Sequence, residues 1–133
     1  MKNINTIFFI LFIALIIGCS SDDKSLVGKW NGTDQIGTVQ TFNFIDSENI
    51  EWTISNDHFD LTEKVKYKAD FSTSPMKLDI YGFPQGPFKG KGFYGIFEFV
   101  EEDKLKVDFE AGIDETIRPA DFQESAVVLE RAK

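Results

Sequence analysis

The chain has 133 residues, with 14 Lys and Arg against 22 Asp and Glu and a formal net charge of −8 at pH 7. A protein that binds nucleic acid needs a basic face for the phosphates, so this balance argues against a nucleic-acid partner. The single cysteine excludes an intrachain disulfide framework. An apolar content of 42% is too high for a disordered chain.

The first eighteen residues have the pattern of a secretory signal peptide. Lys2 gives a positive start, and residues 7–17 form an unbroken apolar run. A helix that spans a bilayer needs about 20 apolar residues, whereas the core of a signal peptide needs roughly 7–15. Residues 1–18 are therefore predicted to be a signal peptide that takes no part in the fold.

A lipid anchor is predicted directly after this segment. Ile16-Ile17-Gly18-Cys19 resembles the lipobox of bacterial lipoproteins. The resemblance implies lipidation of the Cys19 thiol, cleavage before Cys19, and acylation of its new amino group. Several acyl chains such as palmitate on one residue hold a protein stably at a membrane, which is the expected partner. The alternative is an ordinary signal peptide that ends near a cysteine.

The short segment 19–25 is polar and small, as expected for a tether between the anchor and the folded domain. A Ser after the Cys, with acidic residues just beyond, resembles export signals of outer-membrane or surface lipoproteins in some Gram-negative bacteria. We therefore expect a cell-envelope protein anchored in the outer membrane.

From residue 26 onward the dominant pattern is the two-residue period of β-strands. In the run 64–71, apolar residues share one face while three lysines and an aspartate share the other. A helix cannot separate such neighbours, because residues two apart lie on opposed faces. The same alternation, or a less regular apolar run, predicts eight strands in chain order: 26–33, 38–45, 50–55, 64–71, 76–81, 92–100, 104–109 and 126–131.

The connections between these strands carry turn residues. Polar turns are expected at 46–49 and 101–103, and residues 81–92, with four Gly and two Pro, form a predicted loop. At most one short helical turn is expected, at 119–125. Closing eight strands into a barrel buries their apolar faces and removes free edges. Residues 26–133 are thus predicted to form one all-β barrel domain, with a two-sheet sandwich as the alternative.

The strand pattern also carries motifs of a known superfamily. Gly28-Lys29-Trp30 resembles the Gly-x-Trp motif that opens lipocalins, in which the Trp closes one barrel end and an Arg near the last strand packs across it; Arg131 is the matching residue. Further motifs resemble a family of uncharacterised bacterial lipocalin-like domains: Pro75 to Ile80, Gly95 to Glu98, Asp103 to Lys106, and Arg118 to Phe122. The resemblance implies an antiparallel lipocalin-like barrel and no catalytic residues.

Aromatic side chains on the expected strands are candidates for the lining of a ligand cavity. An eight-stranded barrel is wide enough to hold one small ligand or to be filled by side chains, and both readings stay open. Arg118 is a candidate for binding a ligand carboxylate, or for pairing with Asp114, Glu115 or Asp121 and fixing segment 110–125. The candidate ligand-binding residues are Trp52, Tyr67, Phe71, Phe93, Phe97 and Arg118.

The sequence offers little for catalysis or metal binding. The only His, His58, lies in the acidic segment 56–63, whose spacing is not that of a calcium loop, so a solvated turn is expected. The Gly-x-Ser-x-Gly elbow of hydrolases is absent. We therefore expect no enzyme activity, no metal and no cofactor.

Two functions remain open on these grounds. The first is a membrane-anchored lipoprotein whose barrel binds a small apolar or amphipathic ligand. The second is a barrel filled by its own side chains that acts as a protein-interaction or assembly module, with a partner that the sequence does not identify. Strand 92–100, which is apolar on both faces, favours the second.

Overall fold

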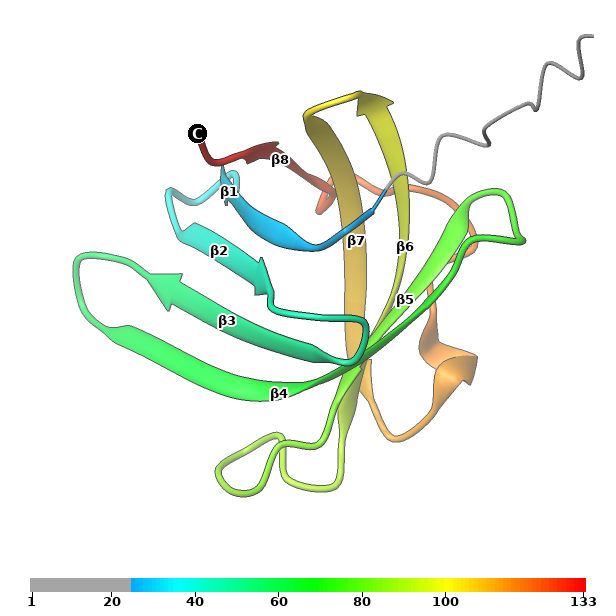
Figure 1. The fold of residues 1–133 in the computed structure, drawn as a ribbon. Helices are drawn as coiled ribbons and strands as arrows, with labels where there is room; N and C mark the ends of the chain where they lie inside the picture. Colours follow the sequence, from blue (N-terminus) through cyan, green and yellow to red (C-terminus); the bar gives the residue numbers. More distant parts are fainter. Residues whose placement is uncertain (1–24) are drawn as a thin grey trace, which may run out of the picture.

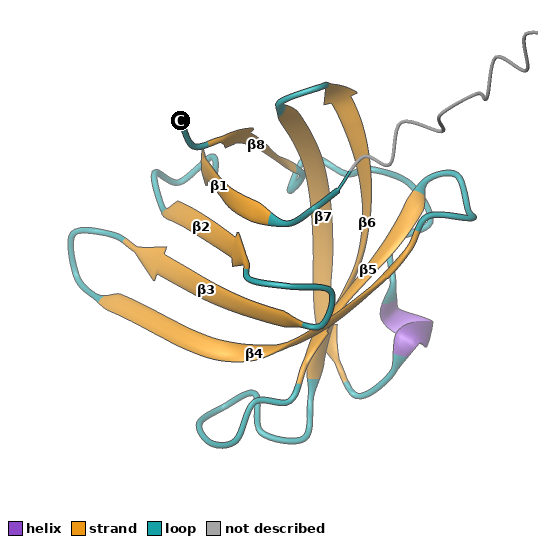
Figure 2. Ribbon diagram, viewed as in Figure 1, coloured by secondary structure: helices purple, strands orange, loops and turns teal. Residues whose placement is uncertain are grey.

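The computed structural model describes residues 25–133. The predicted signal peptide, the lipidation of Cys19 and the tether up to residue 24 lie outside the described residues. The described part is one closed barrel, in which each strand pairs antiparallel with the next and β8 returns to β1 (Figures 1 and 2). The prediction of an eight-stranded antiparallel barrel is thereby confirmed, and the sandwich alternative is wrong.

The strands fall close to the predicted segments. Their bounds are β1 Gly28–Thr33, β2 Val39–Phe44, β3 Asn49–Ser55, β4 Asp60–Asp70, β5 Met76–Tyr81, β6 Gly92–Glu101, β7 Lys104–Gly112 and β8 Val127–Arg131. The largest difference is in β4, which begins four residues earlier than predicted. Residues 60–63 pair with the end of β3, and this cross-strand pairing extends a strand that the sequence pattern alone leaves shorter.

A single 3₁₀ turn, η1, covers Glu115–Ile117 rather than the predicted 119–125. The Asp114 side chain accepts a hydrogen bond from the Thr116 backbone N–H and so caps this turn. Pro119 stands after the turn, where it cannot continue a helix. Within residues 25–133 no helix is long and apolar enough to cross a membrane.

The barrel interior is filled through most of its length by side chains at alternate strand positions. Phe42 lies at its centre, with its ring centroid 5.4 Å from that of Trp52 and 5.9 Å from that of Phe109. Phe109 crosses the interior because Gly95, which faces it from β6, has no Cβ to collide with its ring. Fully buried members of this core include Trp30, Phe42, Phe44, Ile50, Leu78, Ile80, Phe97, Leu105 and Leu129.

The segment 113–126 crosses the outer face of β5, β6 and β7. Arg118 Nη1 donates to Asp79 Oδ1 at 2.6 Å and to the Gly95 carbonyl at 2.8 Å. Asp108, only 2% exposed, accepts hydrogen bonds from the Gln123 backbone N–H and the Ser125 hydroxyl. We call this segment the strap.

The strap explains why strand 92–100 is apolar on both faces. Ile96 points outward from β6, yet it is only 2% exposed, because it lies beside Arg118, Pro119 and Ala120 of the strap. The outer apolar face that suggested a protein partner is therefore covered, at its centre, by the chain itself.

The two ends of the barrel carry different sets of connections. Residues 25–27, the turns after β2, β4 and β6, and the C-terminus gather at one end, which we call the closed end. The connections 34–38, 56–59 and 82–91, together with the strap, emerge at the other end, which we call the mouth. The described chain thus enters at the end opposite loop 82–91 (Figure 1).

Candidate functional site

The closed end is built around Trp30, which is fully buried. Its indole Nε1 donates to the Leu26 carbonyl at 2.8 Å, and the Arg131 guanidinium lies 4.1 Å from its ring centroid. Gly28 has a positive φ of 124°, and a Cβ there would come within 2.9 Å of Arg131 Nη1. Glycine is thus required beside the stacked arginine, the arrangement that the Gly-x-Trp motif implied.

Arg131 also ties the entering chain to this end. It donates to the carbonyls of Val27 and Ser25 at 3.0 and 3.1 Å, and its Nε lies 3.3 Å from Asp103 Oδ1 in the β6–β7 turn. One side chain therefore links the first strand, a turn and the last strand. Its hydrogen bonds and ring contact belong to the structure of the closed end, where a hollow of about 300 Å³ lies on the outside of the β2–β3 turn, beside Asp46, Asn49 and Lys66.

The mouth, by contrast, holds a pocket of about 410 Å³. Such a volume lies in the range of small-molecule sites. Its wall is formed by the ends of β3 and β4 and by loop 82–91, and it is lined by Trp52, Ile54, Leu61, Glu63, Phe83, Gln85, Gly86, Pro87 and Phe88. The lining is mainly apolar, with one carboxylate and one amide side chain.

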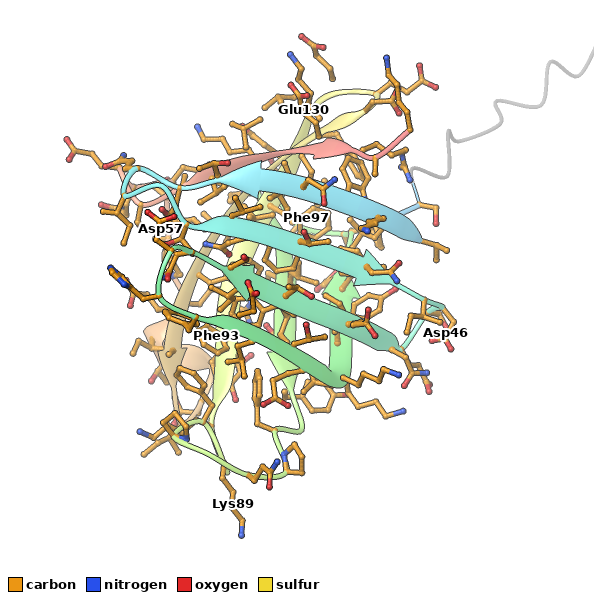
Figure 3. All side chains as sticks on the ribbon, turned by 90° about the vertical axis from the view of Figure 1, so that its left-hand side faces the viewer. Asp46, Asp57, Lys89, Phe93, Phe97 and Glu130 are labelled. Atoms are coloured by element: carbon orange, nitrogen blue, oxygen red, sulfur yellow. The ribbon has the colours of Figure 1, made fainter. Side chains whose placement is uncertain are left out.

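An aromatic cluster forms the floor of this pocket. Trp52 meets Phe93 edge to face with ring centroids 4.7 Å apart, and Phe93 in turn lies 4.8 Å from Phe88 and 5.7 Å from Phe83. Loop 82–91 folds two phenylalanines back onto the barrel, while Lys89 at its tip points away from the barrel (Figure 3). The loop is thus partly held by apolar contacts across the mouth.

Trp52 carries an unpartnered polar atom beside the pocket. The residue is only 7% exposed, and its Nε1 has no hydrogen-bond partner among the described residues. Leaving a buried N–H without an acceptor costs about 1–3 kcal/mol. Unpaired buried donors of this kind are uncommon, so this N–H is an exception among the buried polar groups of residues 25–133.

Glu63 brings a charged group to the inner face of the wall. It stands directly opposite Trp52 in the β3–β4 register and shares its face of β4 with Leu61 and Val65. The neighbouring Lys64 points outward, where its Nζ lies 3.8 Å from Glu51 of β3. The strand alternation therefore keeps the β4 lysines away from Glu63.

Of the aromatic residues predicted to line a cavity, only Trp52 borders the pocket directly, with Phe93 just beneath it. Phe97 is fully buried farther inside the barrel, and Phe71 is half exposed past the end of β4, with its ring 5.5 Å from that of Phe97. Tyr67 is 5% exposed and donates its hydroxyl to the Asp46 carbonyl near the closed end. Phe97 and Tyr67 belong to the filled part of the barrel, and Phe71 lies outside it against Phe97.

Arg118 lies on the outer wall and not at the mouth. Besides Asp79, it has Glu115 Oε2 at 3.7 Å from Nη2. It therefore fixes the strap through Glu115, which was among the predicted partners, and through Asp79, which was not. It borders a separate, shallow hollow of about 490 Å³ between the strap and the β4–β5 turn. A guanidinium already engaged by a carboxylate and a carbonyl has little capacity for a ligand carboxylate.

Several residues of the pocket were not among the sequence candidates. Leu61 and Glu63 fell outside the predicted fourth strand, and Phe83, Gln85 and Phe88 belong to a loop without periodicity. One signal was present: continuing the alternation of Val65 and Tyr67 toward the N-terminus places an acidic residue on an apolar face.

Three acidic side chains in connections have lowered pKa values. The pKa of Asp46 lies below its ordinary value because the Glu48 backbone N–H and the Asn49 side chain and backbone donate to it. Hydrogen bonds from Ser72 and Thr116 lower the pKa values of Asp70 and Asp114 in the same way. Burial, and to a smaller extent the charge of Asp46, raises the pKa of the Tyr67 phenol. These groups order turns and do not border the pocket.

His58 lies at the exposed β3–β4 turn, where the Asn56 side chain accepts from the backbone N–H groups of His58 and Phe59. Across residues 25–133, no three His, Cys, Asp or Glu side chains gather as a metal site would require.

Comparisons with protein-family models, with curated proteins and with solved structures found no match to this chain. The family resemblance therefore stays a prediction from the motifs.

Proposed function

We propose that this chain is a non-enzymatic, membrane-anchored lipoprotein of the cell envelope, whose lipocalin-like barrel binds one small apolar or amphipathic ligand at its mouth. The observation that carries the binding proposal is the mainly apolar pocket of about 410 Å³ at the mouth, whose wall includes the buried side chain of Trp52. The site lies under loop 82–91, because the rest of the interior is occupied by side chains such as Phe42 and Phe97.

The anchor is proposed from the lipobox. The entry of the chain at the closed end supports an orientation in which the mouth pocket faces away from the membrane. Cys19 stands six residues before Ser25, and the chain enters the barrel at the closed end. An anchor at Cys19 therefore leaves the mouth at the end of the barrel farther from the attachment point. A ligand would then enter from the aqueous side of the membrane.

Native mass spectrometry of protein purified from its own host tests the binding half of the proposal. We expect a bound species that is lost in Leu61→Trp, whose added volume fills the pocket from its rim. Val128→Trp is the matched control, because Val128 is similarly exposed, lies on β8 and does not line the pocket. Protein that is consistently free of ligand, and that binds no hydrophobic probe, would rule this half out.

Labelling of growing host cells with radioactive palmitate tests the anchor. The full-length chain should incorporate label and fractionate with the outer membrane, whereas Cys19→Ser should do neither. Label that persists in Cys19→Ser, or an unlabelled wild-type protein, would contradict the anchor and leave the pocket proposal unaffected.

A protein-interaction role is the second candidate, and one observation favours it. The connections around the mouth expose apolar side chains, with Ile36 88%, Ile113 78% and Phe59 51% exposed. The two most exposed large apolar side chains of residues 25–133, Ile36 and Ile113, lie at this end, whereas Ile45 and Phe71 at the closed end are about half exposed. Strongly exposed apolar side chains are typical of contact surfaces. Cross-linking in host membranes should then capture one protein with the wild type and lose it with Ile36→Asp and Phe59→Asp. Capture that is unchanged in these variants would speak against the mouth as the contact surface.

A further inference from the structure

The charge of the pocket points to the chemistry of its ligand. Among its lining residues Glu63 is the only one that carries a formal charge, and the wall contains no Lys, Arg or His. Lys89 and Lys91 stand in the same loop as the lining residues but do not border the pocket. An anionic head group placed in this pocket would therefore meet a carboxylate and no positive charge from the lining.

Glu63 lacks a partner of its own. No hydrogen bond or ion pair joins its carboxylate to another side chain within residues 25–133, although it is only partly exposed. The comparable acid on the opposite face, Glu51, has Lys64 within 3.8 Å. A carboxylate that loses part of its hydration without a counter-ion is unfavourable, and a cation arriving with the ligand would compensate it.

The aromatic wall suits the same kind of group. Trp52, Phe83 and Phe88 surround the pocket, and the faces of such rings attract ammonium groups within about 6 Å. Acidic residues also stand on the neighbouring β3–β4 hairpin at Asp57 and Asp60, and the whole chain carries a formal charge of −8. At the pocket lining, where Glu63 lies and the loop residues Lys89 and Lys91 do not, the field therefore favours cations over anions.

We propose that the mouth pocket selects amphiphiles with a cationic amine head, which pairs with Glu63 while the apolar part lies against Trp52, Phe83 and Phe88. This inference rests on the proposed function, since it names the ligand class of the same pocket. It separates this site from one that takes fatty acids or other anionic amphiphiles, for which a basic residue in the wall would be needed.

Three probes with the same ten-carbon chain test the inference: decylammonium, decanol and decanoate, each titrated below its aggregation limit by calorimetry. We expect decylammonium to bind roughly 3- to 10-fold more tightly than decanol, because a partly exposed charged pair contributes a modest free energy. Decanoate should bind most weakly. Added salt should weaken the binding of decylammonium and leave the binding of decanol unchanged.

Glu63→Gln should remove the advantage of decylammonium, strengthen decanoate and leave decanol unchanged. Glu51→Gln is the matched control, because it removes the same charge from the outer face of the adjacent strand and should leave the ranking unchanged. Thermal unfolding of both variants checks that the barrel is intact. If Glu63→Gln does not fold, the ranking and its salt dependence in the wild type decide the matter.

The failures are distinguishable. If none of the three probes binds, the proposed ligand-binding function itself fails. If decanoate binds as tightly as decylammonium or more tightly, or if a folded Glu63→Gln keeps the same ranking, the cation inference is overturned and the ligand-binding function stands.

Discussion

The two tryptophans of this barrel point inward at opposite ends and have opposite surroundings. At the closed end, Trp30 is fully buried, donates to a carbonyl 2.8 Å away and lies under Arg131. At the mouth, Trp52 is also buried, yet its N–H has no partner and it borders a pocket. The same residue type on the same inner surface thus closes one end and forms a wall of the other.

The difference separates the end that contributes most to stability from the end at which we propose that a ligand binds. At the closed end, Trp30 and Arg131 have hydrogen-bond partners and pack closely, so they contribute to the free energy of folding, although the buried Thr73 hydroxyl of the β4–β5 turn has no partner. The mouth keeps an unpaired donor, an unpaired carboxylate and an unfilled volume, all of which lower stability. Such local costs are typical of sites that gain from a ligand. Substitutions at the two ends should therefore have different consequences.

The largest effect is expected from Trp30→Ala. Removing a fully buried indole leaves a cavity among Phe99, Leu26 and Arg131, so the free energy of unfolding should fall by about 3–5 kcal/mol. Chemical denaturation followed by circular dichroism measures it. A loss below about 1 kcal/mol would mean that this end does not carry the stability assigned to it.

Arg131→Gln should cost less, about 1–3 kcal/mol, because it removes the contact with the Trp30 ring and the bonds to the Val27 and Ser25 carbonyls but leaves the core packed. Arg131→Lys should recover only part of the loss, since the compact Lys ammonium cannot reach both carbonyls and also stack on the Trp30 ring as the planar guanidinium does. Equal stability of the Lys variant and the wild type would contradict the role given to the guanidinium.

The sharpest comparison of the two ends is the pair Trp30→Phe and Trp52→Phe. The first leaves the Leu26 carbonyl without its donor, and we expect a loss of about 1–3 kcal/mol. The second removes an N–H that has no partner, so the expected change in stability is within about 1 kcal/mol. Denaturation of both variants under the same conditions gives the two values. A larger loss for Trp52→Phe than for Trp30→Phe would reverse the proposed contrast.

The smallest effect concerns pH and the β2–β3 turn at the closed end. The pKa of Asp46 is lowered in the folded protein by hydrogen bonds from Glu48 and Asn49, so its stabilising contribution is present above the ordinary value of 3.8. That contribution is lost as the pH falls through the lowered pKa. Asp46→Asn should therefore be less stable than the wild type near neutral pH and lose less stability on acidification. Parallel pH profiles for the two proteins would contradict this.

Much of the barrel follows from local sequence rules. The two-residue period fixes which side chains face inward, and eight such segments without a helical pattern leave few ways to bury them. The resemblance carried by the Gly-x-Trp motif also pointed to Arg131 as the residue that packs across Trp30, and the two side chains are in contact in the structure.

The contacts of the strap were harder to foresee, as Arg118 and Ile96 show. A guanidinium beside acids at 114, 115 and 121 suggested short-range pairing, yet its nearest carboxylate is Asp79, which is distant in sequence. The strand alternation predicts that Ile96 is exposed on the outer face of β6, but the strap covers it. Periodicity cannot report such contacts, because they depend on how a loop returns across the barrel wall.

The sequence by itself thus determined the strand content and the inward faces, because side-chain alternation is a local property, and a motif resemblance indicated the residues that close one end. Closure of β1 against β8, the position of the strap and the pocket at the mouth were decided only by the tertiary structure. Each of them brings together residues far apart in the chain, and their energies depend on packing that no single segment contains.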